Sequence, residues 1–203
     1  MDKQVCWNPK LKNAYISELK NTYEFLKHKF SLSREGVIPV HFFRLRPPNF
    51  PTIRLAQLAG VYSRRSNLFS SIIEAQSLEQ LYAIFEGSTS SFWNTHYTFE
   101  KSSKSSSKTL TKAFINLLII NSIVPIKFAF HKFNRYSNPD NVLAIIRNIP
   151  MEHNSIVDKF HSLYAFGKTA LDSQALIQLK HMYCSKNKCL QCAIGSAILN
   201  RNS

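Results

Sequence analysis

Apolar side chains recur every three or four residues between positions 11 and 30, and this spacing constrains the fold more than any other feature. Lysine and glutamate fill the opposite face of the same segment. A repeat close to 3.6 residues predicts an amphipathic α-helix. Asn8 and Pro9 provide a start signal for it. The apolar positions are Leu11, Tyr15, Leu19, Tyr23, Leu26 and Phe30.

The same reasoning predicts that most of the chain is helical. Glycine is rare, with 5 residues, and phenylalanine is abundant, with 15, which favours closely packed helices. Asn154 and Asp172 are suitable residues for helix N-termini. We therefore predict an all-α, or nearly all-α, multi-helix bundle that forms one domain over residues 1–203. Further helices are expected over residues 51–62, 67–75, 78–85, 140–148, 155–164, 172–183 and 190–199, and from Thr109 or Thr111 to Val124.

Three segments interrupt or connect these helices. Pro47, Pro48 and Pro51 lie within five residues and force an extended, proline-rich loop, although Pro51 also suits the first turn of a helix. The Ser/Lys run over residues 101–108 is expected to be a mobile surface loop. The C-terminal residues 172–200 are expected to form a cysteine-rich helical hairpin.

The sequence gives no sign of a membrane segment or an export signal. The most apolar stretch, residues 114–124, ends at Pro125 and is shorter than the roughly 20 residues that a bilayer requires. The first residues contain no apolar stretch of signal-peptide length. We predict a cytoplasmic protein with no membrane partner.

The chain is strongly basic, with 26 Lys and Arg against 12 Asp and Glu and a formal net charge of +14. Acidic residues are absent over residues 36–73, over residues 101–139 and after Asp172. Two such zones on one face would bind the phosphates of nucleic acid. The alternatives are a basic surface that binds nothing, and arginines that tie the proline-rich loop to the domain or bind helix C-terminal carbonyls. The candidate anion-binding residues are Arg44, Arg46, Arg54, Arg64, Arg65, Lys186 and Lys188.

An aromatic cluster over residues 92–99 is a second candidate for nucleic-acid contact. Trp93, His96 and Tyr97 would stack on bases if they were exposed. The alternative is that these side chains belong to the core of a helical domain.

Three cysteines near the C-terminus are the best candidates for a metal site. Cys184, Cys189 and Cys192 have a C-x4-C-x2-C spacing, and His181 lies three residues before Cys184 on the same predicted helix. This layout suits a tetrahedral zinc site, or an iron–sulfur cluster held by the thiols and one further ligand such as Cys6. The alternatives are buried apolar thiols and a redox disulfide.

Several motifs together resemble an uncharacterised bacterial family, domain of unknown function 2851, over nearly the whole chain. They are the segment from Arg44 to Ala59, the W-x2-H-Y-x-F pattern at Trp93, and the cysteine motif that runs to Gly195. The resemblance is to the C-terminal half of that family. It implies a nuclease-like N-terminal half that this sequence lacks, so the chain is either a truncated product or a separate C-terminal module.

Two functions follow from these observations. The first is a metal-stapled module that binds nucleic acid through a basic face and serves the absent N-terminal half. The second is a metal-free structural or protein-interaction domain that packs on that half. Paired carboxylates, a phosphate-binding glycine loop and a nucleophile elbow are all missing from the sequence, so we do not expect this half to be an enzyme by itself.

Overall fold

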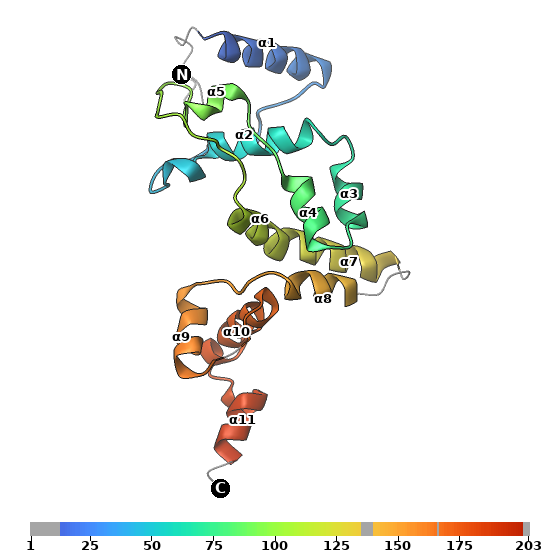
Figure 1. The fold of residues 1–203 in the computed structure, drawn as a ribbon, viewed down its shortest axis with the longest axis vertical. Helices are drawn as coiled ribbons and strands as arrows, with labels where there is room; N and C mark the ends of the chain where they lie inside the picture. Colours follow the sequence, from blue (N-terminus) through green and yellow to red (C-terminus); the bar gives the residue numbers. More distant parts are fainter. Residues whose placement is uncertain (1–12, 135–139, 166, 201–203) are drawn as a thin grey trace. The chain divides into compact units, whose positions relative to one another are not determined.

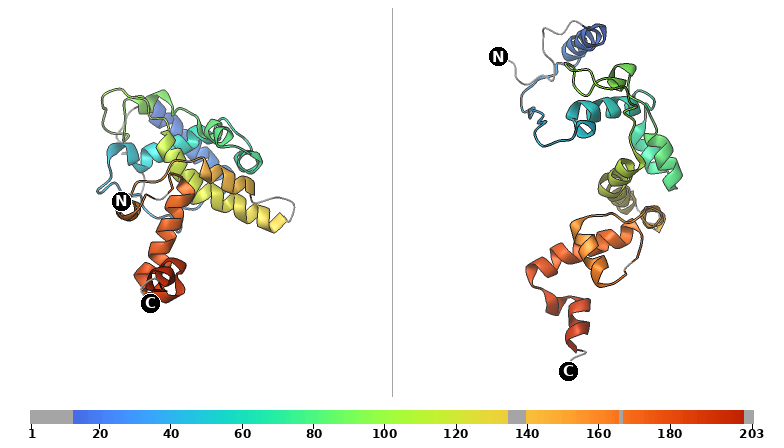
Figure 2. Two further views of the ribbon diagram at one scale, coloured as in Figure 1. Left: turned by 60° about the horizontal axis from the view of Figure 1, so that its bottom comes forward. Right: turned by 60° about the vertical axis from the view of Figure 1, so that its left-hand side comes forward.

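The computed structural model describes residues 13–134, 140–165 and 167–200 of the chain. These residues form helices and connecting segments and no β-strand, which confirms the all-α prediction (Figures 1 and 2). Two isolated bridges, His96 with Ser102 and Pro150 with Thr169, are the only extended pairings among them. The chain groups into two compact units, residues 1–68 with 84–111 and residues 69–83 with 112–203. The prediction of one domain did not foresee this division.

Unit 1, residues 1–68 and 84–111, is built around an aromatic and aliphatic core. Ile53 and Trp93 are almost fully buried in it. The indole nitrogen of Trp93 donates a hydrogen bond of 3.0 Å to the hydroxyl of Tyr15, and the Tyr15 ring stacks on Phe92 with centroids 4.6 Å apart. The elements of this unit are α1 (Ala14–Lys29), η1 (Pro47–Asn49), α2 (Pro51–Tyr62) and α5 (Ser91–Asn94).

Buried side chains of α2 hold the segment that follows α5. The Thr52 hydroxyl donates to the carbonyl of Tyr97 over 2.6 Å, and the Gln57 amide donates to the carbonyl of Lys108 over 2.9 Å. Both side chains are buried. Since an irregular segment has no helical partners for its carbonyls, these bonds satisfy groups that would otherwise be costly to bury.

The Ser/Lys run 101–108, predicted to be a mobile loop, is tied down in the structure. The backbone N–H of Ser103 donates to Thr95, and that of Ser106 donates to Asn94. The Lys108 ammonium is buried and donates to the carbonyls of Asn94 and Ser106. Sequence composition indicates surface polarity correctly here, but it does not reveal these long-range bonds.

Unit 2, residues 69–83 and 112–203, holds most of the remaining helices. Its core contains Leu81, Ile119, Val142, Ile145 and Val157, all nearly inaccessible to solvent. The helices outside unit 1 are α3 (Leu68–Glu74), α4 (Leu78–Phe85), α6 (Lys112–Leu118), the π-helical turn η2 (Ile119–Ile123), α7 (Val124–Asn134), α8 (Asp140–Arg147), α9 (Ser155–Leu163), α10 (Ala170–Met182), η3 (Cys184–Lys186), η4 (Cys189–Gln191) and α11 (Ala193–Asn200). The first residue of α3 and the last two of α4 are assigned to unit 1.

The helix that begins at Lys112 does not end at Pro125. It continues through η2 and α7 to Asn134, a run of 23 residues with a mean hydropathy of 1.8 in its most apolar window. The Val124 N–H bonds to the carbonyl of Ile119, five residues back, so a π-helical turn directly precedes the proline that cannot donate. By length and composition alone this run would cross a membrane. One such helix is weak evidence, because core helices of soluble proteins meet the same criteria.

A buried lysine in this run connects it to α3. Lys127 is only 1% exposed, and its ammonium donates to the carbonyls of Ile72, Ile73 and Ala75 over 2.9, 2.6 and 2.7 Å. These carbonyls lie at the C-terminal end of α3, where no helical donor is available. Burial lowers the pKa of Lys127. Three short bonds to carbonyls compensate the loss of hydration of the ammonium.

We predict that Lys127→Met destabilises the protein by about 3 kcal/mol, because the apolar replacement leaves three buried carbonyls without a donor. Lys132→Met, at an exposed position of the same helix, is the matched control and is expected to change stability by less than about 0.5 kcal/mol. Urea unfolding followed by circular dichroism measures both. Equal stability of the two variants would show that the Lys127 bonds are not important.

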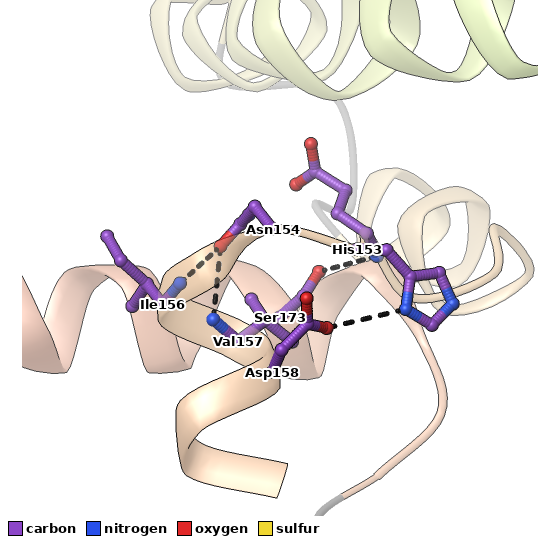
Figure 3. Close-up of polar contacts among 7 residues, drawn as sticks. His153, Asn154, Ile156, Val157, Asp158 and Ser173 are labelled. Carbon is purple, nitrogen blue, oxygen red and sulfur yellow. Dashed lines mark hydrogen bonds and ion pairs between the residues drawn. The ribbon is translucent and has the colours of Figure 1, made fainter.

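Helix α9 starts as the sequence predicts. The Asn154 side-chain oxygen accepts from the N–H groups of Ile156 and Val157, both over 3.0 Å (Figure 3). Helix α10 starts earlier than predicted, because Thr169 is its cap and Asp172 is the third residue of a capping box. The Thr169 hydroxyl and backbone N–H donate to the Asp172 carboxylate and lower its pKa.

Asn154→Ala is expected to lower the free energy of unfolding by about 1 kcal/mol, since two N–H groups in the first turn of α9 lose their acceptor. Ser155→Ala alters the neighbouring exposed residue, whose side chain makes no cap bond, and serves as the control. Thermal unfolding of the two variants side by side gives the comparison. A loss with Ser155→Ala as large as that with Asn154→Ala would contradict the capping role.

Candidate functional site

The excess of positive charge is larger in unit 1 than in unit 2. Unit 1 has 15 Lys and Arg against 6 Asp and Glu, whereas unit 2 has 11 against 6. Among the described residues of unit 1, the one ion pair between side chains within 4.0 Å is Lys27 with Glu24, at 3.9 Å and exposed. The basic side chains of unit 1 therefore outnumber its carboxylates by nine, 15 against 6.

The segment before η1 presents basic and apolar side chains together. Residues 37–42 have no regular secondary structure, and Ile38 and Phe43 are 81% and 80% exposed. Arg44 adopts a left-handed backbone conformation with φ of 61°, and its guanidinium carbon lies 5.1 Å from the centre of the Phe43 ring. Arg44 and Arg46 are both exposed. We call Phe43, Arg44 and Arg46 the arginine loop.

Arg54 has a structural role instead. Its terminal nitrogens donate to the side chain of Gln57 over 2.9 Å and to the side chain of Asn49 over 2.6 Å. Asn49 belongs to η1, so Arg54 ties the proline-rich turn to α2, as one alternative from the sequence proposed. Partial burial lowers the pKa of Arg54, which nevertheless stays charged at neutral pH.

The other two arginines of this zone lie at the end of α2. The Arg64 side chain is exposed, and its Nε donates to the carbonyl of Gly60 over 3.0 Å. The Gly60 carbonyl lies in the last turn of α2, so this bond is the kind that the sequence alternative proposed for Arg44, Arg46 and Arg54. Arg65 is half-buried and makes contacts within the protein.

The structure places the predicted stacking residues mainly inside unit 1. Trp93 is 3% exposed and belongs to the core, so its ring is not available to a base. The His96 ring stacks on Phe92 at 4.1 Å, and its Nδ1 lies 3.0 Å from the Phe92 carbonyl. The Lys108 ammonium covers the Tyr97 ring at 4.2 Å. The exposed ring beside an arginine is Phe43, which sequence analysis did not single out as a stacking residue.

Two of the three C-terminal cysteines, Cys184 and Cys189, lie on short helical turns, Cys192 lies between η4 and α11, and no disulfide joins the three. Cys184 is exposed on η3 and lines a cavity of about 310 Å³ with Phe160 of α9 and Lys180 of α10. Cys189, on η4, is exposed, and Cys192 is buried. Lys186 and Lys188 are exposed on the same turns, and His181 is exposed on α10.

The described part of the chain contains no cluster of three or more His, Cys, Asp or Glu side chains arranged to hold a metal ion. Cys6, the proposed further ligand, lies outside the described residues. The structure therefore does not bring the predicted ligands together, and the zinc or iron–sulfur centre stays a prediction of the sequence.

If the centre forms, elemental analysis of the reduced protein should find about one zinc ion, or an iron–sulfur cluster, per chain. Cys189→Ser removes one of the thiol ligands and should lose the bound metal.

Backbone contacts hold the end of the chain. A Cβ added at Gly195 would lie 2.4 Å from the carbonyl oxygen of Cys189, so α11 approaches η4 as closely as a glycine allows. The Ser196 hydroxyl donates to the carbonyl of Leu190 over 3.1 Å. Helix α11 thus packs on η4, and α10 packs on η3. The predicted hairpin over residues 172–200 stays a prediction.

A histidine and a carboxylate lie close together at the start of α9. The His153 ring lies 3.5 Å from the Asp158 carboxylate, and both side chains are exposed (Figure 3). Ser173 belongs to α10. Its side chain is fully buried, and its hydroxyl donates to the carbonyl of Ala170. Ser173 holds the segment before α9 on α10, because its hydroxyl oxygen also accepts from the backbone N–H of Glu152.

Fold and surface together define an all-α protein with a strongly basic helical unit. Residues 5–155 match the model of a family described as "Protein of unknown function (DUF2851)", and the chain belongs to this family. The match ends before the cysteine motif on which part of the resemblance rested. No curated protein and no solved structure matches the chain.

Proposed function

We propose that this chain is a nucleic-acid-binding module whose contact surface includes the arginine loop of unit 1. The observation that carries the proposal is the exposure of Arg44 and Arg46 in a stretch, residues 36–73, that contains no acidic residue. Arginine binds phosphate through its planar fork of donors. Phosphate contacts of this kind dominate the affinity of proteins for nucleic acid.

The Phe43 ring supports a single-stranded ligand. It is 80% exposed and lies against the Arg44 guanidinium. An exposed ring beside a cation stacks on an unpaired base while the cation contacts the backbone. Base-paired strands keep their faces covered, so duplexes would use the arginines alone.

A protein partner is the second candidate, and one observation favours it. Unit 1 exposes apolar side chains around the same loop, and such patches mark interaction surfaces. The partner in this case is the N-terminal half that the family resemblance implies. The exposed side chains are Val37, Ile38, Val40, Phe43 and Leu45.

The proposal predicts salt-dependent binding that depends on the arginine loop. The double variant Arg44→Gln and Arg46→Gln should weaken binding to a fluorescent single-stranded oligonucleotide at least about tenfold in low salt, and should reduce the slope of log K against log salt by about 1 to 2. Fluorescence polarisation over a salt series measures both quantities.

Lys132→Gln with Lys168→Gln is the matched control, because it removes the same charge from exposed positions in unit 2. An equal loss in both double variants would mean that net charge alone binds the strand. Binding to anionic vesicles with none to DNA or RNA would contradict the proposal in favour of a membrane surface. Association with the N-terminal half that persists in high salt, with no nucleic-acid binding, would favour the second candidate.

A further inference from the structure

Unit 1 contains a cavity whose lining includes no residue of the arginine loop. Its volume is about 390 Å³, within the range of small-molecule sites. The polar groups in its wall are hydroxyls and one guanidinium, and no acidic residue lines it. The lining residues are Tyr15, Ala56, Ala59, Gly60, Ser63, Arg64, Ser88, Thr89, Ser90 and Trp93.

Thr89 is the most informative residue of this wall. Its side chain is 8% exposed, and its hydroxyl is buried without a hydrogen-bond partner among the described residues. A buried hydroxyl with no partner costs about 1–3 kcal/mol. A threonine that serves packing alone would carry this cost for no gain, whereas a ligand oxygen in the cavity would remove it.

The Arg64 guanidinium is held in place by the hydrogen bond of its Nε. Nε donates to the Gly60 carbonyl, which leaves the two terminal nitrogens for other contacts. The head of the side chain lies directly against Gly87, because a Cβ added there would overlap the guanidinium. Gly60 has a similar role, since its own Cβ would lie 2.6 Å from the carbonyl oxygen of Ser88. The two glycines therefore bring α2 and residues 87–89 together around the cavity.

Tyr15 adds a further donor to the lining of the cavity. Its hydroxyl oxygen accepts from the Trp93 indole, so the hydroxyl proton is free to point to another acceptor. Ser63 donates its one hydroxyl proton to the Gly60 carbonyl, so its oxygen can act only as an acceptor toward a ligand. The donors available among the lining residues are thus the Arg64 terminal nitrogens and the hydroxyls of Tyr15 and Thr89.

We propose that this cavity binds a phosphate monoester. A monoester carries a charge of about −1.5 to −2 at neutral pH and three acceptor oxygens. A guanidinium fork and separate hydroxyl donors match such a tetrahedral group better than a planar carboxylate, which offers two oxygens. The group is supplied either by a free mononucleotide or by the phosphorylated end of a strand. The second source would extend the proposed nucleic-acid binding, but the site itself does not depend on it.

Isothermal titration with inorganic phosphate and with a nucleoside 5′-monophosphate tests the site. Thr89→Val removes the hydroxyl with little change of shape and should weaken binding at least about tenfold, with stability unchanged or raised because an unpaired buried hydroxyl is removed. Thr89→Ser keeps the hydroxyl and should retain binding. Gly87→Ala should also weaken binding, because it displaces the Arg64 head while the charge of the protein is unchanged.

Absence of binding to the native protein, or equal binding by Thr89→Val and Thr89→Ser, would overturn the proposal. Competition by 5′-phosphorylated and 5′-hydroxyl oligonucleotides then distinguishes the two sources. A 5′-phosphate advantage that Thr89→Val abolishes identifies a strand end, and monophosphate binding without that advantage identifies a free metabolite. Oligonucleotide binding tests the proposed function, and the comparison of Thr89→Val with Thr89→Ser in monophosphate binding tests this site, so failure of the site and failure of the proposed function give different results.

Discussion

The fold depends on basic and amide side chains that satisfy carbonyls left open by its helix ends and irregular segments. Lys127 caps the end of α3 in unit 2, and Lys108 and Gln57 hold the chain after α5 in unit 1. Each donor is buried, and each bond joins segments far apart in sequence. An all-α fold without these donors would leave buried carbonyls unpaired, at a cost of about 1–3 kcal/mol for each group.

This use of basic residues changes what the net charge of +14 means. Part of it is committed to carbonyl oxygens within the fold, as in Lys127 and Lys108, and is not offered to a ligand. What remains for a polyanion is the exposed portion, of which Arg44 and Arg46 are the clearest members. Total charge therefore overstates the binding surface, and the exposure of each cation decides its role.

The sequence predicted most of the helices, because the 3.6-residue repeat of apolar positions is a local property. It also identified the Asn154 cap, whereas it ended one helix at Pro125 because the π-helical turn that accommodates the proline depends on neighbouring packing. Burial of Trp93 arises from contacts between distant segments, such as its bond to Tyr15. The bond of Arg54 to Asn49 is local, but it depends on how the proline-rich turn folds back on α2. The unpaired hydroxyl of Thr89 leaves no trace in the sequence, since threonines of every role look alike there.

The two candidate binding surfaces of unit 1 differ in how well their donors are fixed before a ligand arrives. Arg44 and Arg46 lie on an exposed segment, so binding must restrict long side chains, and the attraction weakens with salt. In the cavity, the Arg64 side chain is held through its Nε and lies against Gly87, and the Tyr15 hydroxyl is fixed by the bond that it accepts from Trp93. Fixed donors lose little entropy on binding. The loop is therefore suited to broad contact with a strand, and the cavity to recognition of one chemical group.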